Sequence, residues 1–139
     1  MSGPLTGIRI VEFAGLGPGP FCGMMLADHG AEVIRLGRTR AESWIGGDPA
    51  TQFLNRSRKG LSVDLKTSEG RELSRRLCKS ADGLIEGFRP GVMERLGLGP
   101  EILQQDNPVN RRAIRTTDRR PTLTRVGRLF EGSSALDFI

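Results

Sequence analysis

The sequence contains few of the residues from which metal centres and disulfide frameworks are built. Its 139 residues include two cysteines, one histidine and no tyrosine, and aromatic residues make up 5% of the chain. Cys22 and Cys78 are too few and too far apart in sequence to indicate a disulfide framework or a metal site. They are typical of buried free thiols in a reducing compartment. We therefore predict a cytoplasmic protein without a bound metal, and we assign no catalytic role to His29.

Long hydrophobic runs are also missing. Hydrophobic residues make up 37% of the chain, but none of their runs is long enough to cross a membrane. The first residues, Met-Ser-Gly-Pro-Leu, lack the charged and then apolar pattern of a secretion leader. A single domain is the default at this length, and we expect neither membrane insertion nor secretion.

The basic residues that give the chain its net charge of +5 are unevenly distributed. Residues 1–106 hold 14 basic and 13 acidic residues, whereas residues 107–139 hold seven arginines, no lysine and three acidic residues. The excess positive charge therefore belongs almost wholly to the C-terminal tail. It does not indicate that the folded body binds nucleic acid or an anionic membrane.

The clearest structural pattern lies near the N-terminus. A β-branched and apolar run over residues 8–13 is followed by a turn rich in glycine and proline. Apolar residues at helical spacing over 21–29 and a second apolar run over 32–36 complete a strand–helix–strand unit. Such a unit predicts a parallel sheet whose ligand binds at the carboxyl ends of the strands.

The rest of the body continues this alternation. We predict a loop over 38–50, strands over 61–65 and 83–86, a helix that begins at Thr67 or Ser68, and two short helices over 91–96 and 101–105. The predicted class is α/β, a Rossmann-like parallel sheet with flanking helices.

The glycine-proline turn has two interpretations, a phosphate-binding loop or a tight turn with no ligand. Free N–H groups at the following helix would suit a phosphate. Pro20 stands where the dinucleotide fingerprint requires glycine or alanine, and Arg35 and Arg38 stand where a nicotinamide site would carry an acidic residue. This pattern disfavours a NAD-linked dehydrogenase and favours a nucleotide with an extra phosphate.

A second turn, over residues 87–91, is expected at the same edge of the sheet, followed by the short helix over 91–96. Phe88 is then either a core aromatic or part of a ligand-binding rim, and Arg89 and Arg95 are either solvated or on that rim. Because the loops after parallel strands gather at one edge, residues 14–20, Arg38, Lys66 and 87–95 are expected to converge there.

Four motifs in residues 4–108 carry a family resemblance. They are PLTGIRIVEFAGLGPGPFCGMMLADHGAEVIRL, LSVDLKTSEG, LIEGFRPGVMERLGLGPEIL and the Gln-Gln-Asp-Asn-Pro that follows. In this order and spacing they resemble the N-terminal part of the family III coenzyme A transferases, and within that family the α-methylacyl-CoA racemases. The resemblance implies an incomplete portion of the family's fold that handles acyl-CoA, with coenzyme A as part of the substrate and no tightly bound cofactor. It also implies a homodimer in complete relatives.

The resemblance also implies which residues would contact coenzyme A. By similarity, the first turn lies against the nucleotide, a base after the second strand meets the phosphates, and the later loops line the adenine and pyrophosphate. The corresponding residues are Leu16, Gly17, Pro18, Arg38, Val63, Lys66, Gly87, Phe88 and Arg95.

The catalytic part of the family pattern is not found in this chain. Racemases of the family use a His and an Asp after the matched region, and the transferases use an Asp nucleophile there. Residues 109–139 contain no histidine and no glycine-rich turn, so we assign no catalytic residue. We interpret 1–108 as a portion of the CoA-binding α/β domain and 109–139 as a divergent, arginine-rich tail that is irregular or comes from a shifted reading frame.

The predicted function is therefore acyl-CoA binding by a racemase-like N-terminal portion that is inactive alone. A CoA transferase of the same family and a non-catalytic CoA-binding remnant are the alternatives. A tail that docks on RNA or on an acidic partner is a further alternative for residues 109–139, although these arginines are not interleaved with aromatic residues.

Overall fold

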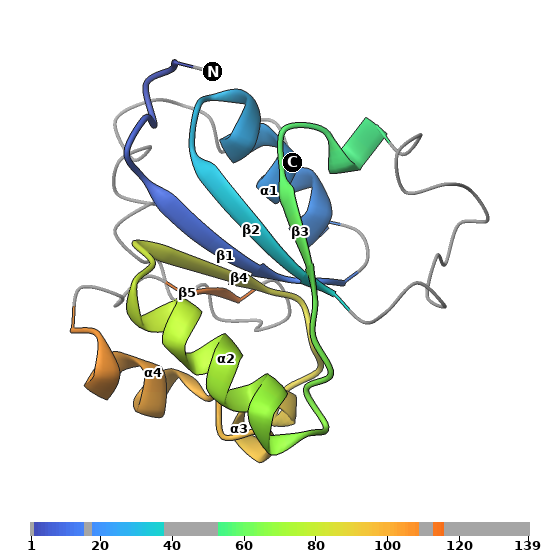
Figure 1. Cartoon of the computed structure of the whole chain (residues 1–139), viewed down its shortest axis with the longest axis vertical. Coiled ribbons are helices and arrows are strands. Elements are labelled where there is room, and N and C mark those ends of the chain that lie inside the picture. The colour runs from blue at the N-terminus through green and yellow to red at the C-terminus, as the bar shows by residue number, and fades with distance from the viewer. Residues whose placement is uncertain (1, 16–17, 38–52, 109–112, 116–139) are drawn as a thin grey trace.

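A five-stranded parallel sheet forms the centre of the molecule, with helices on both of its faces (Figure 1). The computed structural model describes residues 2–15, 18–37, 53–108 and 113–115. In chain order the elements are β1 (Arg9–Phe13), α1 (Pro18–Asp28), β2 (Glu32–Gly37), the 3₁₀ helix η3 (Phe53–Asn55), β3 (Lys59–Ser62), α2 (Ser68–Lys79), β4 (Gly83–Glu86), α3 (Val92–Arg95), α4 (Pro100–Asp106) and β5 (Ala113–Arg115). The strand order is β3-β2-β1-β4-β5, and every neighbouring pair is parallel. The predicted α/β class, a Rossmann-like parallel sheet with flanking helices, is confirmed.

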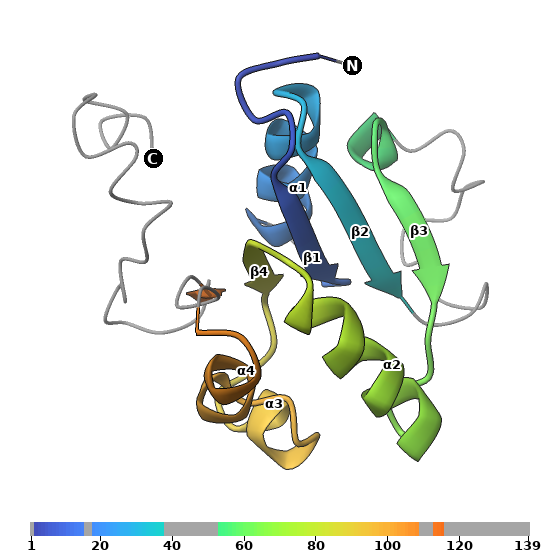
Figure 2. The same ribbon diagram turned by 60° about the vertical axis from the view of Figure 1, so that its left-hand side comes forward.

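The two faces of the sheet carry separate cores. Successive side chains of a strand point to opposite faces, so Val11 and Phe13 pack with residues of α2, α3 and α4, whereas Ile10 packs with Ala27 of α1. Figure 2 shows the resulting layers, with α1 on one side of the sheet and the other three helices on the opposite side. The chain changes faces because α1 leads from β1 to β2, while α2 leads from β3 back to β4 on the other side of β1.

Helix α1 approaches the sheet closely because small residues face it. Gly19, Gly23 and Ala27 recur at intervals of four residues, and all three are buried. A Cβ atom at Gly19 would lie 3.7 Å from Ile85 Cγ2, and one at Gly23 would overlap the carboxylate of Glu12. These contacts fix the first two turns of α1 over β4 and β1.

Helix α2 begins with a complete N-terminal cap. The Oγ1 atom of Thr67 accepts a hydrogen bond from the N–H of Gly70 at 3.0 Å and donates one to the carbonyl of Asp64 at 2.8 Å. A side-chain acceptor at this position satisfies one of the free N–H groups of the first turn. The predicted start of this helix at Thr67 or Ser68 is confirmed.

Two predicted boundaries need correction. Helix α1 begins at Pro18 rather than at residue 21, since proline is compatible with the first turn, where no N–H partner is needed. Strand β3 covers Lys59–Ser62 rather than 61–65. The alternating run continues beyond the ladder with β2, but the turn at Asp64 ends the strand.

The arginine-rich tail also needs a partial correction. Three of its residues, Ala113–Arg115, form β5 and pair in parallel with Leu84–Glu86 of β4. The prediction of an irregular tail is wrong for these three residues, because backbone pairing to a strand edge does not require an alternating pattern. The other residues of 109–139 lie outside the described part of the chain.

Membrane insertion has no candidate element in the described ranges. None of the helices there has both the length and the apolar character needed to cross a bilayer.

Candidate functional site

The carboxyl edge of the sheet is the candidate site. All strands are parallel, so the segments that follow them leave the sheet at the same edge. The order of the strands reverses between β1 and β4, and ligands of such sheets bind outside this switch point. Helix α1 starts here at Pro18, which is exposed, and the turns after β3 and β4 carry Lys66 and residues 87–91.

The turn after β3 is held by hydrogen bonds to its backbone. The N–H of Lys66 donates to Asp64 Oδ1 at 2.9 Å, and Arg71 Nη1 donates to the carbonyl of Lys66 at 2.8 Å. Lys66 itself is exposed. Val63 belongs to the core and is 5% exposed, so only its backbone is available to a ligand.

The turn after β4 is organised by a buried carboxylate. Glu86 is 3% exposed, and its Oε2 accepts a hydrogen bond from the N–H of Phe88 at 3.0 Å. The ring of Phe88 packs edge-on against Phe13 with 6.2 Å between ring centroids. Phe88 is only half-buried, and Gly87 is half-buried as well. Phe88 therefore joins the core through one edge of its ring while it stands at the rim of the sheet.

The short helix α3 closes this edge. Gly91 precedes it with φ +83°, a left-handed conformation that glycine adopts without strain. A Cβ atom at Gly91 would lie 3.3 Å from Arg95 Nη1, so the guanidinium of Arg95 folds back over the start of its own helix. Arg95 is exposed at the last position of α3.

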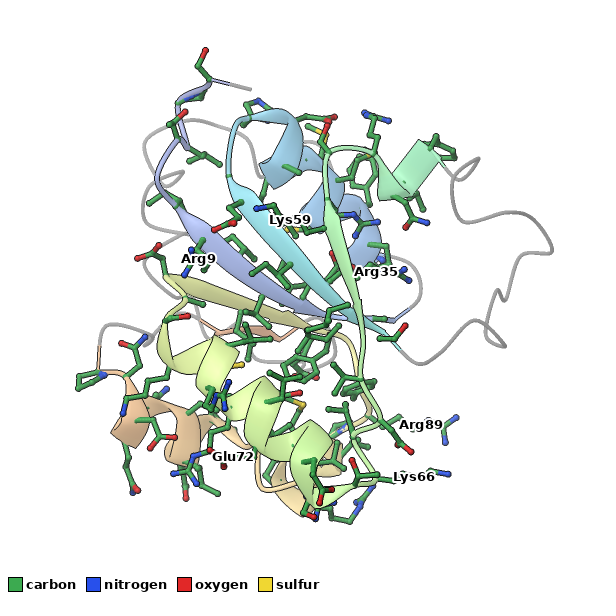
Figure 3. All side chains as sticks on the ribbon, in the orientation of Figure 1. Arg9, Arg35, Lys59, Lys66, Glu72 and Arg89 are labelled. Atoms are coloured by element: carbon green, nitrogen blue, oxygen red, sulfur yellow. The ribbon has the colours of Figure 1, made fainter. Side chains whose placement is uncertain are left out.

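Three exposed cations, Lys66, Arg89 and Arg95, stand on the turns and the short helix at this edge. None of them forms an ion pair with another residue in the described ranges. Figure 3 shows the Lys66 and Arg89 side chains pointing outward on the same side of the molecule. Positive groups without carboxylate partners are suited to a polyanionic ligand.

Arg35 does not join these cations, although its position in the sequence suggests a phosphate contact. It lies on the α1 face of β2, and its Nε atom is 3.7 Å from Glu12 Oε1. In Figure 3 it stands beside α1 in the upper part of the molecule, apart from Lys66 and Arg89. Burial lowers the pKa of Arg35, and Glu12 opposes this shift.

Three of the residues implied by the family resemblance cannot be placed. Leu16, Gly17 and Arg38 lie outside the described residues. The structure brings Pro18, Lys66, Gly87, Phe88 and Arg95 to one edge of the sheet, and it puts the Val63 side chain in the core.

Two residues that organise the site were not singled out from the sequence. Asp64 accepts a hydrogen bond from the N–H of Lys66, and Glu86 accepts one from the N–H of Phe88. In both cases the acceptor stands two residues before the donor. An acidic residue at this spacing is the signal of a side chain that fixes its own turn.

Metal ligands are not grouped in the part of the chain that the structure describes, where no set of three or more His, Cys, Asp or Glu residues could hold an ion. His29 follows α1 and precedes β2, at the amino edge of the sheet and so opposite the candidate site. Its Nδ1 is 2.7 Å from the carbonyl of Met25.

The chain is similar to known proteins over most of its length. Residues 5–109 match the model of CoA-transferase family III. The mouse and human alpha-methylacyl-CoA racemases are 55% and 51% identical over 104 residues, which is 75% of this chain and 26% of each racemase. A crystal structure of a mutant of Rv3272 from Mycobacterium tuberculosis, 39% identical, superimposes with a TM-score of 0.70 over 82% of this chain and 32% of that one.

The family match over residues 5–109 includes the N-terminal strand–helix–strand unit and both turns of the candidate site. The chain spans about a quarter of the length of the two racemases. Sequence and fold agree on the same relatives, and the chain belongs to CoA-transferase family III.

Proposed function

We propose that the carboxyl edge of the sheet binds the phosphate-bearing part of acyl-CoA, and that the chain is the acyl-CoA-binding N-terminal portion of a racemase-like protein. The observation that carries this proposal is the group of cations, Lys66, Arg89 and Arg95, without carboxylate partners in the described ranges. Coenzyme A carries a pyrophosphate and a 3′-phosphate, which need several positive charges around them.

The local geometry supports a phosphate rather than a carboxylate ligand. The cations come from separate turns, so they can surround an extended polyanion. The first turn of α1 adds the positive end of the helix dipole at the same edge, although Pro18 and Pro20 have no N–H and only Gly19 and Phe21 of that turn carry one. The half-buried ring of Phe88 offers an apolar surface beside them.

A titration with free CoA by calorimetry tests the site. Lys66→Ala and Arg95→Ala are each expected to weaken binding about tenfold or more, because each removes charged hydrogen bonds to phosphate. Arg76→Ala is the matched control, since Arg76 is an exposed arginine on α2 away from this edge, and its affinity should equal that of the wild type. Equal losses in all three variants, or no binding by the wild type, would refute the proposal.

The proposal includes the absence of racemase chemistry in this chain. Inversion next to a thioester needs a base to remove the α-proton and an acid to return it on the other face. The single histidine lies at the opposite edge of the sheet. Incubation with a 2-methylacyl-CoA in deuterated water should therefore give α-proton exchange at the background rate. Exchange well above background would show that the chain holds a working base.

A CoA transferase is the second candidate within the same family. The same edge would hold the CoA moiety in either case, so CoA binding does not separate them. A transferase forms acyl intermediates on a carboxylate nucleophile. Mass spectrometry after incubation with acyl-CoA would detect such an adduct, and we expect none.

The proposal extends to self-association, as the family resemblance implies for complete relatives. Phe21 and Met25 of α1 and Phe53 of η3 are exposed large apolar side chains on two elements that contact each other. Sedimentation of the wild type should give a dimer, and Phe21→Ser combined with Phe53→Ser should shift it toward the monomer. A wild type that is monomeric at all concentrations would contradict this part of the proposal.

A further inference from the structure

A carboxylate is buried between α1 and the sheet, away from the candidate site. Glu12 of β1 is 0% exposed. Its neighbours along the strand alternate faces, and its side chain points to the α1 face. Ionised carboxylates are almost never fully buried without a partner, because the loss of hydration is costly.

The hydrogen-bonded partner of Glu12 is an arginine that precedes β3, and Arg35 of β2 lies farther away, with its Nε 3.7 Å from Glu12 Oε1. Arg58 Nη1 donates to Glu12 Oε2, and the Arg58 side chain is 2% exposed. In the sheet, β2 lies between β1 and β3, so the Arg58 side chain crosses the α1 face of β2 to reach Glu12. The same guanidinium donates through Nη2 to the carbonyl of Leu54 and to Asn55 Oδ1. One buried group thus connects β1, η3 and the start of β3.

Helix α1 covers this pair. Gly23 lies directly above it, since a Cβ atom there would overlap Glu12 Oε2 and lie 3.1 Å from Arg58 Nη1. The absence of a side chain at Gly23 gives the ion pair its space. Ser57, the residue before Arg58, has φ +60°, an uncommon conformation for a residue with a side chain. The backbone at this point is therefore set to direct Arg58 inward.

Strand β3 has few other contacts that hold it in place. It is an edge strand, and all four of its residues are exposed. Its backbone pairs with β2, but none of its side chains belongs to the buried core, and Leu61, its one large apolar residue, is 38% exposed. The buried side chains nearest to it in sequence are Arg58, which precedes it, and Val63, which follows it.

We propose that the Glu12–Arg58 pair is the anchor of β3, which ties this edge strand and η3 to the centre of the sheet beneath α1. The pair performs the task that inward-facing apolar side chains perform in a central strand. It positions the turn after β3, and with it Lys66, relative to the turns after β1 and β4. The anchoring is a property of the chain without any ligand, so it stands or falls independently of CoA binding.

Peptide-resolved hydrogen exchange tests the anchor. Four proteins are compared: the wild type, Glu12→Gln, Arg58→Met and the double variant. Exchange is followed in two segments. Segment 53–62 contains η3 and β3 at the anchored edge, and segment 83–106 contains β4 together with α3 and α4 on the face opposite α1. Glu32→Gln is the matched control, because Glu32 also joins these strands through ion pairs with Arg9 and Lys59, but its side chain is 33% exposed to solvent.

The double variant separates anchoring from the cost of an unpaired buried charge. Glu12→Gln leaves Arg58 buried without a carboxylate, and Arg58→Met leaves Glu12 buried with only the more distant Arg35, so each single substitution destabilises the whole fold. The double variant removes both buried charges. It leaves Arg35, whose side chain is 32% exposed and so can be hydrated, and exchange in 83–106 should therefore return to near the wild-type rate. Exchange in 53–62 should remain at least about tenfold faster than in the wild type, because the edge strand has lost its anchor. The control should accelerate exchange in 53–62 much less than the double variant does, because ion pairs that reach solvent contribute little to stability.

Two results would overturn the anchor. In the first, exchange in both 53–62 and 83–106 returns to the wild-type rate in the double variant. This would mean that the two charges only neutralise each other and do not hold β3 in place. In the second, both segments exchange faster to the same extent, which would mean a global loss of stability. If a single variant does not fold, the double variant alone still decides between these outcomes.

Discussion

The two cysteines show how burial controls the chemistry of a single side chain. Cys78 of α2 faces the core and is 1% exposed, and burial raises the pKa of its thiol to about 12. Burial also raises the pKa of the half-buried Cys22, and the negative charge of Glu12 raises it further. Only the thiolate reacts with disulfide reagents.

We therefore expect both thiols to react slowly in the folded protein near pH 8. With an aromatic disulfide reagent, Cys78 should remain protected until guanidinium unfolds the chain, and two thiols should then react at once. The variant Cys22→Ser identifies which thiol contributes any slow phase before unfolding. Rapid reaction of Cys78 in the native protein would contradict the buried position.

Gly23→Ala should destabilise the protein, although replacing glycine with alanine inside a helix usually stabilises it. Gly→Ala in a helix interior normally stabilises by about 1 kcal/mol. At Gly23 the new methyl group would overlap the Glu12 carboxylate, and we expect a loss of about 1–3 kcal/mol, as for other overpacked sites. The measurement is a urea unfolding curve. Gly60→Ala on β3, where a Cβ would meet nothing within 4 Å, is the control and should lose far less stability.

At the scale of the element, α2 depends on its N-terminal cap. Thr67→Ala removes both hydrogen bonds of the Thr67 hydroxyl, to Gly70 and to Asp64, and should cost about 1 kcal/mol. Thr67→Ser retains the hydroxyl and should cost much less. The same substitution loosens the turn that holds Lys66, so CoA affinity should fall in Thr67→Ala and not in Thr67→Ser. Equal unfolding midpoints for the two variants would contradict this cap.

The element scale also connects the anchor of β3 with the candidate site. If the Glu12–Arg58 pair positions Lys66, then Lys66→Ala should weaken CoA binding less in the Glu12→Gln/Arg58→Met background than in the wild type. The cycle compares the wild type, Lys66→Ala, the Glu12→Gln/Arg58→Met variant and the variant that carries all three substitutions. Their calorimetric affinities for CoA give the coupling energy between Lys66 and the Glu12–Arg58 pair. Additive effects would mean that the turn after β3 holds Lys66 without help from the anchor.

Most elements could be predicted from local sequence patterns, and the exceptions have physical reasons. The β4 strand and the α2 cap are visible as an apolar run and as a Thr-Ser-Glu start. The position of β3 is set by pairing with Ile34–Gly37, a contact between distant segments that alternation within 61–65 does not reveal. Strand β5 is recruited by the free edge of β4 and has no pattern of its own.

At the scale of the whole molecule, topology predicts the edge of the candidate site and the basic residues on its turns, but not that Arg35 points away from that edge. Arg35 lies inside β2 near its end and Arg89 follows β4, yet Arg35 points toward Glu12 and Arg89 is exposed at the rim. The face on which a strand residue points depends on register, which only the folded sheet defines. For the same reason the buried Glu12–Arg58 pair, separated by 46 residues, could not be foreseen.

Ion pairs at the surface join elements that are distant in sequence. Glu32 accepts hydrogen bonds from Arg9 at 2.6 Å and from Lys59 at 2.7 Å, which links three neighbouring strands. Arg75 of α2 binds Asp106 of α4 with 2.8 Å between Nη2 and Oδ1. Hydrogen bonds from Lys59 and Arg9 lower the pKa of Glu32, and the hydrogen bond from Arg75 lowers that of Asp106.

These shifts predict that the folded state becomes less stable in acid. A carboxyl whose pKa is lower in the folded protein than in the unfolded chain stabilises the fold above its ordinary pKa, about 4, and loses that effect as the pH falls. The urea midpoint should therefore decline from pH 5 to pH 3. Glu32→Gln should make this decline shallower. Salt at about 1 M should also reduce the decline, because it screens the ion pairs of Glu32 and Asp106 at the surface. Burial raises the pKa of Glu12 instead, so keeping this carboxyl ionised costs stability above its ordinary pKa, and the relief of that cost on acidification opposes the trend. A midpoint that rises steadily on acidification would mean that Glu12, rather than the surface pairs, governs the pH dependence.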